Sequence, residues 1–270
     1  MNEQDTSNNE RVTEAQAPRP TKVNKKNTNN DEKYVLYADI MGFKEKVMRT
    51  KHEDLKKELK GLREELDDWL SPFLENVKTF KVSFFSDSIL IVEESSPRGF
   101  QRISIAAAAL MAASLKCKFP LKGAIAKGEF TYEEEEQLFF GQAIIDAFLL
   151  EEEVHYYGIL AHHTMEEDIK KHSKEWVGCN GEINGRIPYV LSPVPLKSGK
   201  TSHYHLAYNL ISTKREIGVN IETTNKTISG TVSGAPRIYV DNTLQVLKED
   251  LRLYMVTLEK QRKVKFQAFR

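Results

Sequence analysis

Two aspartates lie where short apolar segments of this 270-residue chain end, and together they could bind metal. Asp39 lies near the end of the segment 34–40, and Asp87 lies at the tip of a predicted hairpin over 79–92. In an antiparallel sheet these segments can be neighbours, and adjacent carboxylates repel unless a cation neutralises them. Mg²⁺ and Mn²⁺ accept carboxylates, a backbone carbonyl, water and substrate phosphates as ligands. The pair therefore predicts a divalent metal site; the alternative is that each aspartate only shapes a turn or caps a helix.

The residues after Asp39 predict a place for phosphate. Met41, Gly42 and Phe43 lead directly into a predicted helix, and free N–H groups at a helix N-terminus bind phosphate well. Gly42 also has no Cβ that would keep a phosphate away from the backbone. We therefore predict that a triphosphate lies between the metal and this turn.

Strand alternation adds candidates for the same pocket. Because every second side chain shares one face of a strand, Tyr37 lies with Asp39, and Ser83 and Phe85 lie with Asp87. The predicted nucleotide-binding residues are therefore Tyr37, Met41, Gly42, Phe43, Ser83 and Phe85.

Hydrophobic periodicity predicts the elements that position these residues. Strands are predicted at 34–40, in the hairpin over 79–92, at 121–131 and at 156–161. Helices are predicted at 44–74, as one helix or two broken near Thr50, at 100–116 and at 139–153. This order describes an α+β fold with helices on one face of an antiparallel sheet, and a ferredoxin-like βαββαβ core has this pattern.

Outside this core the patterns are weaker. Residues 1–32 contain almost no large apolar side chains, so we predict a disordered tail. After residue 165, strands are predicted at 187–196, 203–210 and 237–240, a helix at 246–260 and a loop at 213–236.

Composition limits the partners and the location. Lys plus Arg and Asp plus Glu are equal at 39 each, so no net charge favours nucleic acid or a membrane, and neither is expected as a partner. No apolar segment is long enough to span a bilayer, and the N-terminus has no signal-peptide core. Cys117 and Cys179 have no metal-ligand or disulfide-framework spacing. We therefore expect a cytoplasmic protein.

The segment from Tyr37 to Phe43, YADIMGF, resembles the D-I-x-G-F signature of class III nucleotidyl cyclases. Ser86-Asp87 stands where that family has Gly-Asp, the segment 121–128 is similar to its glycine-bearing strand, and Gly141 opens what resembles its dimer-interface helix. The resemblance covers about residues 34–165. It implies a catalytic domain over 33–165, with 166–270 as a C-terminal extension.

The same resemblance implies a homodimer with active sites at the subunit interface. Asp39 and Asp87, helped by the backbone carbonyl of Ile40, would hold two Mn²⁺ or Mg²⁺ ions per site. The ribose 3′-oxygen would then attack the α-phosphorus of a nucleoside triphosphate, and pyrophosphate would leave.

Two departures from the family concern the substrate. Purine cyclases carry a Lys four residues before the second Asp, where this chain has Ser83, and an Asn and an Arg on the interface helix, which are both missing from 141–151. The chain is more similar to the pyrimidine cyclases of the bacterial Pycsar antiphage system. It shares their Ser-Asp-Ser turn, a strand like Lys122-Gly123-Ala124, and a helix ending Ala-x-x-Leu-Glu at 147–151.

That resemblance implies a lyase that converts UTP to 3′,5′-cyclic UMP and pyrophosphate in antiviral defence, with the product activating a separate effector. Three alternatives stay open. The enzyme could make cyclic CMP from CTP, it could be an inactive nucleotide-binding sensor, or it could be a purine cyclase with an unusual base pocket, which Ser83 argues against.

Other polar residues have two interpretations each. Lys122 could contact a phosphate of the partner subunit's nucleotide, but a surface lysine on an edge strand is the favoured interpretation. The pairs His162-His163 and His203-x-His205 could bind metal, but solvated or core histidines are favoured because no further ligand stands at useful spacing.

Overall fold

The computed structural model describes residues 32–74, 77–172, 189–210, 221–228 and 235–268. The predicted tail lies outside these residues except for its last member, Glu32. The strands are β1 (Glu32–Ile40), β2 (Lys81–Phe85), β3 (Ser88–Glu94), β4 (Leu121–Glu129), β5 (Thr131–Glu133), β6 (Leu138–Phe140), β7 (Ile159–Ala161), β8 (Tyr189–Leu196) and β9 (Gly199–Leu206). The helices are α1 (Phe43–Arg49), α2 (His52–Leu74), α3 (Pro97–Lys116), α4 (Gln142–Glu153), α5 (Glu166–His172), α6 (Ile221–Ile228) and α7 (Ala235–Ala268), with short 3₁₀ turns at His163–Met165 and Tyr208–Leu210.

The first four strands and the helices between them form the predicted ferredoxin-like core. Their order in the sheet is β2-β3-β1-β4, and all three pairings are antiparallel. β1 therefore lies in the interior of the sheet, with β3 on one side and β4 on the other. The fold class predicted from the sequence is confirmed.

The sheet continues beyond this core. β7 pairs with β4 in parallel, and β9 and β8 follow, so that the sheet has seven strands. α4 lies between β4 and β7 in the chain, because a parallel connection needs a crossover. The C-terminal strands and α7 contribute buried residues to the same apolar core as β1, among them Leu206, Val240 and Leu247.

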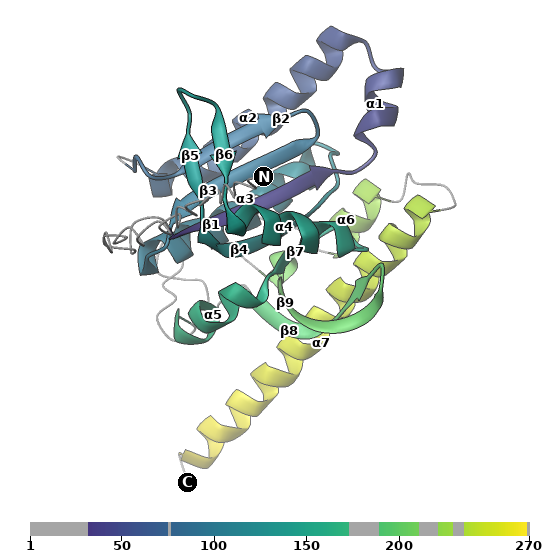
Figure 1. Cartoon of the computed structure of the whole chain (residues 1–270). Helices are drawn as coiled ribbons and strands as arrows, with labels where there is room; N and C mark the ends of the chain where they lie inside the picture. The colour runs from purple at the N-terminus through teal and green to yellow at the C-terminus, as the bar shows by residue number, and fades with distance from the viewer. Residues whose placement is uncertain (1–31, 75–76, 173–188, 211–220, 229–234, 269–270) are drawn as a thin grey trace, which may run out of the picture. The chain divides into compact units, whose positions relative to one another are not determined.

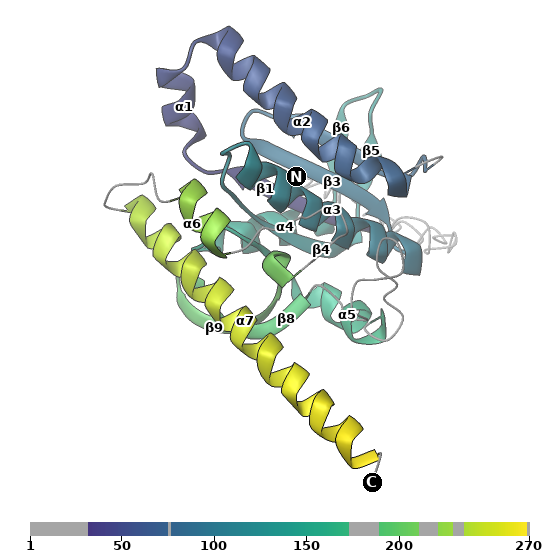
Figure 2. The same ribbon diagram turned by 180° about the vertical axis from the view of Figure 1, so that it is seen from behind.

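The two faces of the sheet carry different helices, which corrects the prediction that all helices lie on one face. Tyr34, Leu36 and Ala38 of β1 pack with residues of α2 and α3. Val35, on the alternate face, packs instead with Ala143 of α4. Figure 1 shows α4 in front of the sheet. Figure 2, which views the molecule from the opposite side, shows α2 and α3 in front of it.

Several predicted elements differ in their bounds or type. The long amphipathic segment is two helices broken at Thr50, as one of the two predicted forms had it. The strand predicted at 156–161 is shorter, and the segment 131–140 holds an unpredicted hairpin, β5–β6. Residues 237–240 are helical rather than extended, and part of the predicted loop 213–236 forms α6. None of the described helices combines the length and the apolar character needed to span a membrane.

Candidate active site

The structure brings Asp39 and Asp87 to the same end of neighbouring strands. Asp39 is next to last in β1 and lies opposite Ser88, the first residue of β3. Asp87 precedes Ser88 in the two-residue turn between β2 and β3, and its carbonyl accepts a 2.9 Å hydrogen bond from the N–H of Ile40. Ser86 supplies the positive φ of 55° that this tight turn requires. The two aspartates therefore lie at the same end of neighbouring strands, and their role as metal ligands stays a prediction.

The charges around Asp39 favour a cation. The pKa of Asp39 is raised to about 6, first by burial and then by the carboxylates of Glu151 and Asp87, against the opposing effect of Lys122. A carboxylate that is this costly to ionise alone gains strongly from a positive ion. Asp39 and Asp87 thus fit a divalent metal by the chemistry of their donor atoms.

The two aspartates are an incomplete ligand set. Among the described residues, no group of three or more His, Cys, Asp or Glu side chains is arranged to hold a metal. Mg²⁺ and Mn²⁺ commonly complete their shells with water, backbone carbonyls and substrate phosphates. A metal here would therefore depend on such ligands, of which the Ile40 carbonyl is one candidate.

The turn after Asp39 leaves only part of its backbone for a phosphate. Gly42 has a left-handed φ of 75° and immediately precedes α1. Phe43 is buried, so only its backbone could meet a ligand. The N–H of Met41 already donates a 2.8 Å hydrogen bond to the carbonyl of Pro120. The N–H groups of Gly42 and Phe43 are thus the better phosphate donors.

Three predicted base-pocket residues lie on the same face of the sheet as Asp39, but in different surroundings. The Tyr37 hydroxyl shares a 2.8 Å hydrogen bond with the Ser88 hydroxyl, and its ring meets Phe148 edge to face at 5.5 Å. The Ser83 hydroxyl pairs with that of Tyr132 at 2.7 Å. Phe85 is 81% exposed. Tyr37 lies within electrostatic reach of both aspartates, whose charges help to raise the pKa of its hydroxyl after the larger effect of burial.

An open apolar groove begins at Tyr37. It encloses about 480 Å³ and is lined by Tyr37, Phe139, Phe140, Gly141, Gln142, Ile144, Ile145 and Phe148. Three large apolar side chains of α4, Ile145, Phe148 and Leu149, are exposed. α4 contains neither Asn nor Arg.

Lys122 contradicts the favoured interpretation of the sequence, a surface lysine on an edge strand. It lies on β4, an interior strand, and is only 6% exposed, so it is neither a surface lysine nor on an edge. Its ammonium pairs with the Glu151 carboxylate at 2.8 Å and donates to the Glu151 carbonyl at 2.9 Å.

Glu151 was not a predicted site residue, although its spacing held a signal. The buried residues of α4 are Ala143, Ala147 and Glu151, four residues apart. This spacing puts them on one face of a helix, so a glutamate in register with two small buried residues is itself expected to be buried. A buried glutamate needs a partner, and the nearby Lys122 provides it.

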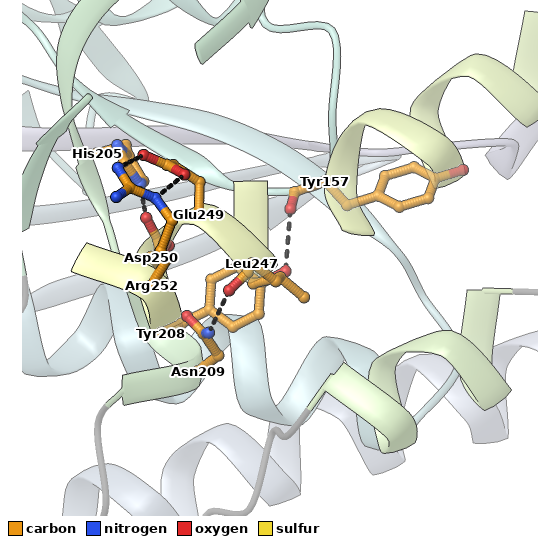
Figure 3. A network of polar contacts seen from close by, with 8 residues as sticks. All are labelled: Tyr157, His205, Tyr208, Asn209, Leu247, Glu249, Asp250 and Arg252. Atoms are coloured by element: carbon orange, nitrogen blue, oxygen red, sulfur yellow. Dashed lines mark hydrogen bonds and ion pairs between the residues drawn. The ribbon is translucent and has the colours of Figure 1, made fainter. Parts of the chain in front are cut away.

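The histidines form no described metal site. His162 and His163 have ring centroids 4.0 Å apart, and burial lowers the pKa of His162. His205 is fully buried and bonds to the Asp250 carboxylate of α7 at 2.8 Å (Figure 3). His205 is therefore a core histidine that helps to attach α7, as the favoured interpretation predicted.

The sequence matches no protein-family model and no curated protein sequence. Among solved structures, the chain is similar to the monomeric guanylyl cyclase domain of the RhoGC fusion protein from the aquatic fungus Blastocladiella emersonii. That match has 17% identity and a TM-score of 0.48, and covers 66% of this chain and 95% of the other.

Two further structures are similar in the same way. The guanylate cyclase domain of RhGC from Catenaria anguillulae, solved in complex with GTP, has 17% identity and a TM-score of 0.47, covering 65% of this chain and 96% of the other. The adenylyl cyclase CyaB from P. aeruginosa has 15% identity and a TM-score of 0.41, covering 69% and 97%. At these identities the likeness concerns the fold alone.

Proposed function

We propose that this chain is a nucleotidyl cyclase that binds a nucleoside triphosphate and two divalent ions at Asp39 and Asp87. The observation that carries the proposal is the meeting of these carboxylates at one end of β1 and β3, where Asp39 has a raised pKa of about 6. The turn at Gly42 supports it, because it offers backbone N–H groups beside the carboxylates.

In this proposal each residue has a separate task. Asp39, Asp87 and the carbonyl of Ile40 would hold Mn²⁺ or Mg²⁺, and the ions would lower the pKa of the ribose 3′-hydroxyl and neutralise the phosphates. The N–H groups of Gly42 and Phe43 orient the triphosphate. The ribose 3′-hydroxyl would lose its proton to water, and its oxygen would form a bond to the α-phosphorus. The bond from the α-phosphorus to the bridging oxygen would break, and pyrophosphate would leave.

We propose UTP as the substrate and 3′,5′-cyclic UMP as the product. Tyr37 next to the carboxylates and the exposed ring of Phe85 would narrow the pocket towards a pyrimidine, and Ser83 lacks the charge and reach of the lysine that reads a purine. CTP is the second candidate, since a hydroxyl such as that of Ser83 can donate or accept. The resemblance to Pycsar cyclases assigns the product to antiphage defence, in which it would activate a separate effector.

We propose that the active form is a homodimer in which α4 and the groove at Tyr37 meet a second copy. Ile145, Phe148 and Leu149 of α4 and Phe140 of β6 together expose a set of large apolar side chains. Such sets on soluble proteins commonly mark interfaces. A partner bound here would also cover the open groove at Tyr37.

An inactive nucleotide sensor is the second candidate function. It is favoured by α4, which has apolar residues and no Asn or Arg to stabilise the transition state. Such a protein would bind the nucleotide and metal but would not convert it.

The test is incubation of the purified protein with each of the four nucleoside triphosphates and Mn²⁺. Cyclic UMP and pyrophosphate from UTP are expected. Asp39→Ala or Asp87→Ala should lower the activity by a factor of at least about 10³. Asp68→Ala, on the exposed side of α2, is the matched control and should be fully active. Nucleotide binding without turnover would favour the sensor, and preferred conversion of ATP or GTP would contradict the pyrimidine proposal.

A further inference from the structure

A buried ion pair lies directly beside the candidate metal site. Lys122 and Glu151 are 6% and 3% exposed, and removing ions this deeply buried from water has a large free-energy cost. Replacing such a pair with neutral residues is often harmless to stability. Fold stability is therefore a weak reason for this pair, and its position suggests another.

The position of Lys122 relative to Asp39 is set by the sheet. Lys122 of β4 is the residue opposite Asp39 of β1, and side chains opposite each other in an antiparallel pair lie on the same face with Cβ atoms about 4.5–5.5 Å apart. A lysine in that place can reach the aspartate easily. Among the described ion pairs, however, its ammonium joins Glu151 and not Asp39.

Two contacts on Glu151 direct the ammonium away from Asp39. The carboxylate lies 2.8 Å from Nζ, and the Glu151 backbone carbonyl accepts a 2.9 Å hydrogen bond from the same atom. The charges of both residues still act on Asp39, whose pKa Glu151 raises and Lys122 lowers. Three charges of alternating sign, on Glu151, Lys122 and Asp39, thus share one small region.

The C-terminal part of the chain holds Glu151 in this place. Just after α4, Val154 bridges to Leu196 of β8, and the N–H of His155 donates to the Pro195 carbonyl at 3.2 Å. From α7, Asn242 donates to the His155 carbonyl at 2.7 Å, and the Tyr239 ring packs on His155 at 4.7 Å. The end of α4 is therefore fixed by elements that follow the catalytic core in sequence.

We propose that Glu151 is a positioning residue that restrains Lys122, so that the Asp39 carboxylate stays available for the metal. Without Glu151, the Lys122 ammonium would pair with Asp39 and compete with the divalent ion. The inference rests on the proposed function in that it assumes a metal at Asp39. It adds a role for the C-terminal elements, which keep Glu151 in reach of Lys122.

The test measures Mn²⁺ binding by electron paramagnetic resonance, with and without 3′-deoxy-UTP, which cannot cyclise. Glu151→Gln should weaken Mn²⁺ binding by about 10–100-fold, the usual effect of losing a residue that supports a metal ligand. Adding Lys122→Met to Glu151→Gln removes the competitor and should restore the affinity to within about three-fold of the wild type. Glu152→Gln, the exposed neighbour with the same charge change, should bind as the wild type does.

Three results would overturn the inference. They are wild-type affinity in Glu151→Gln, a double variant that binds as weakly as Glu151→Gln alone, and a wild-type chain that binds no Mn²⁺. If Glu151→Gln fails to fold, Glu151→Asp serves instead, because the shorter carboxylate keeps the charge but draws back from the ammonium. A wild type that binds Mn²⁺ but converts no nucleotide contradicts the proposed function only, because the Mn²⁺ measurements do not depend on turnover.

Discussion

α3 and α4 are both apolar helices on the central sheet, but they use their apolar residues differently. Fourteen residues of α3 are buried, between the sheet and α2. Only three residues of α4 are buried, and Ile145, Phe148 and Leu149 face outward. The apolar side chains of α3 are buried within the chain, whereas those of α4 leave an exposed apolar surface that another molecule could cover.

The buried polar groups of the two helices differ as well. Ser104 and Ser114 of α3 donate hydrogen bonds to carbonyls of their own helix, so these bonds do not involve the candidate site. Glu151 of α4 instead neutralises Lys122 beside Asp39. The comparison teaches that α3 supports the fold, while α4 connects the outer surface to the charges of the site.

The largest expected effect is on the fold, from Leu110→Ala in α3. Leu110 is fully buried, so its loss leaves a cavity and should lower the free energy of unfolding by about 2–5 kcal/mol. Urea denaturation measures this. Leu149→Ala in α4 is the matched variant and should stay within about 0.5 kcal/mol of the wild type for the isolated subunit. Equal losses in the two variants would break the comparison between the helices.

The next effect concerns association. Leu149→Glu puts a charge on the outward face of α4, which the proposed homodimer would bury, so the dimer should dissociate at least about 100-fold more readily. Sedimentation equilibrium measures the dissociation constant, and turnover should fall with it. Met48→Glu is the control, since Met48 is 79% exposed on α1. A monomeric wild type, or a dimer insensitive to Leu149→Glu, would contradict the assignment of α4 as the interface.

The smallest effect is a dependence of stability on pH that reports the charge at the site. The folded-state pKa of Asp39 is about 6, above its ordinary value of 3.8. The folded protein therefore holds the Asp39 proton more tightly than the unfolded chain does. This stabilises the fold fully below pH 3.8, and the stabilisation is lost as the pH rises through 6. In metal-free buffer, Asp39→Asn should match the wild type near pH 4 and melt at a modestly higher temperature near pH 8.

Added Mn²⁺ should raise the melting temperature of the wild type near pH 8 but not that of Asp39→Asn, because only the wild type keeps the metal ligand. Differential scanning fluorimetry in EDTA and in Mn²⁺ measures both effects. Identical pH profiles of the two proteins would show that its surroundings do not raise the pKa of Asp39. They would also count against an electrostatic effect of Glu151 of α4 on the site.

Local patterns determined much of the ferredoxin-like core. Alternation and a Gly-containing turn predicted β1, the β2–β3 hairpin, the break at Thr50 and α3, because each depends on residues close in sequence. The meeting of Asp39 and Asp87 followed from two strand ends in an antiparallel layer. The nucleotide-binding assignments of Tyr37, Ser83 and Phe85 stay predictions.

Only the tertiary structure decided the surroundings of Lys122. Whether β4 is an edge or an interior strand depends on β7 and β9, and β7 pairs with β9 through Leu160 and His205, far apart in the chain. The same long-range packing made 237–240 a helical segment, because Tyr239 is buried against His155 and Tyr157. Composition and periodicity describe what each segment can bury. Which segment lies next to Asp39 is settled by pairing between strands that are far apart in the chain, such as that of Asp39 with Lys122.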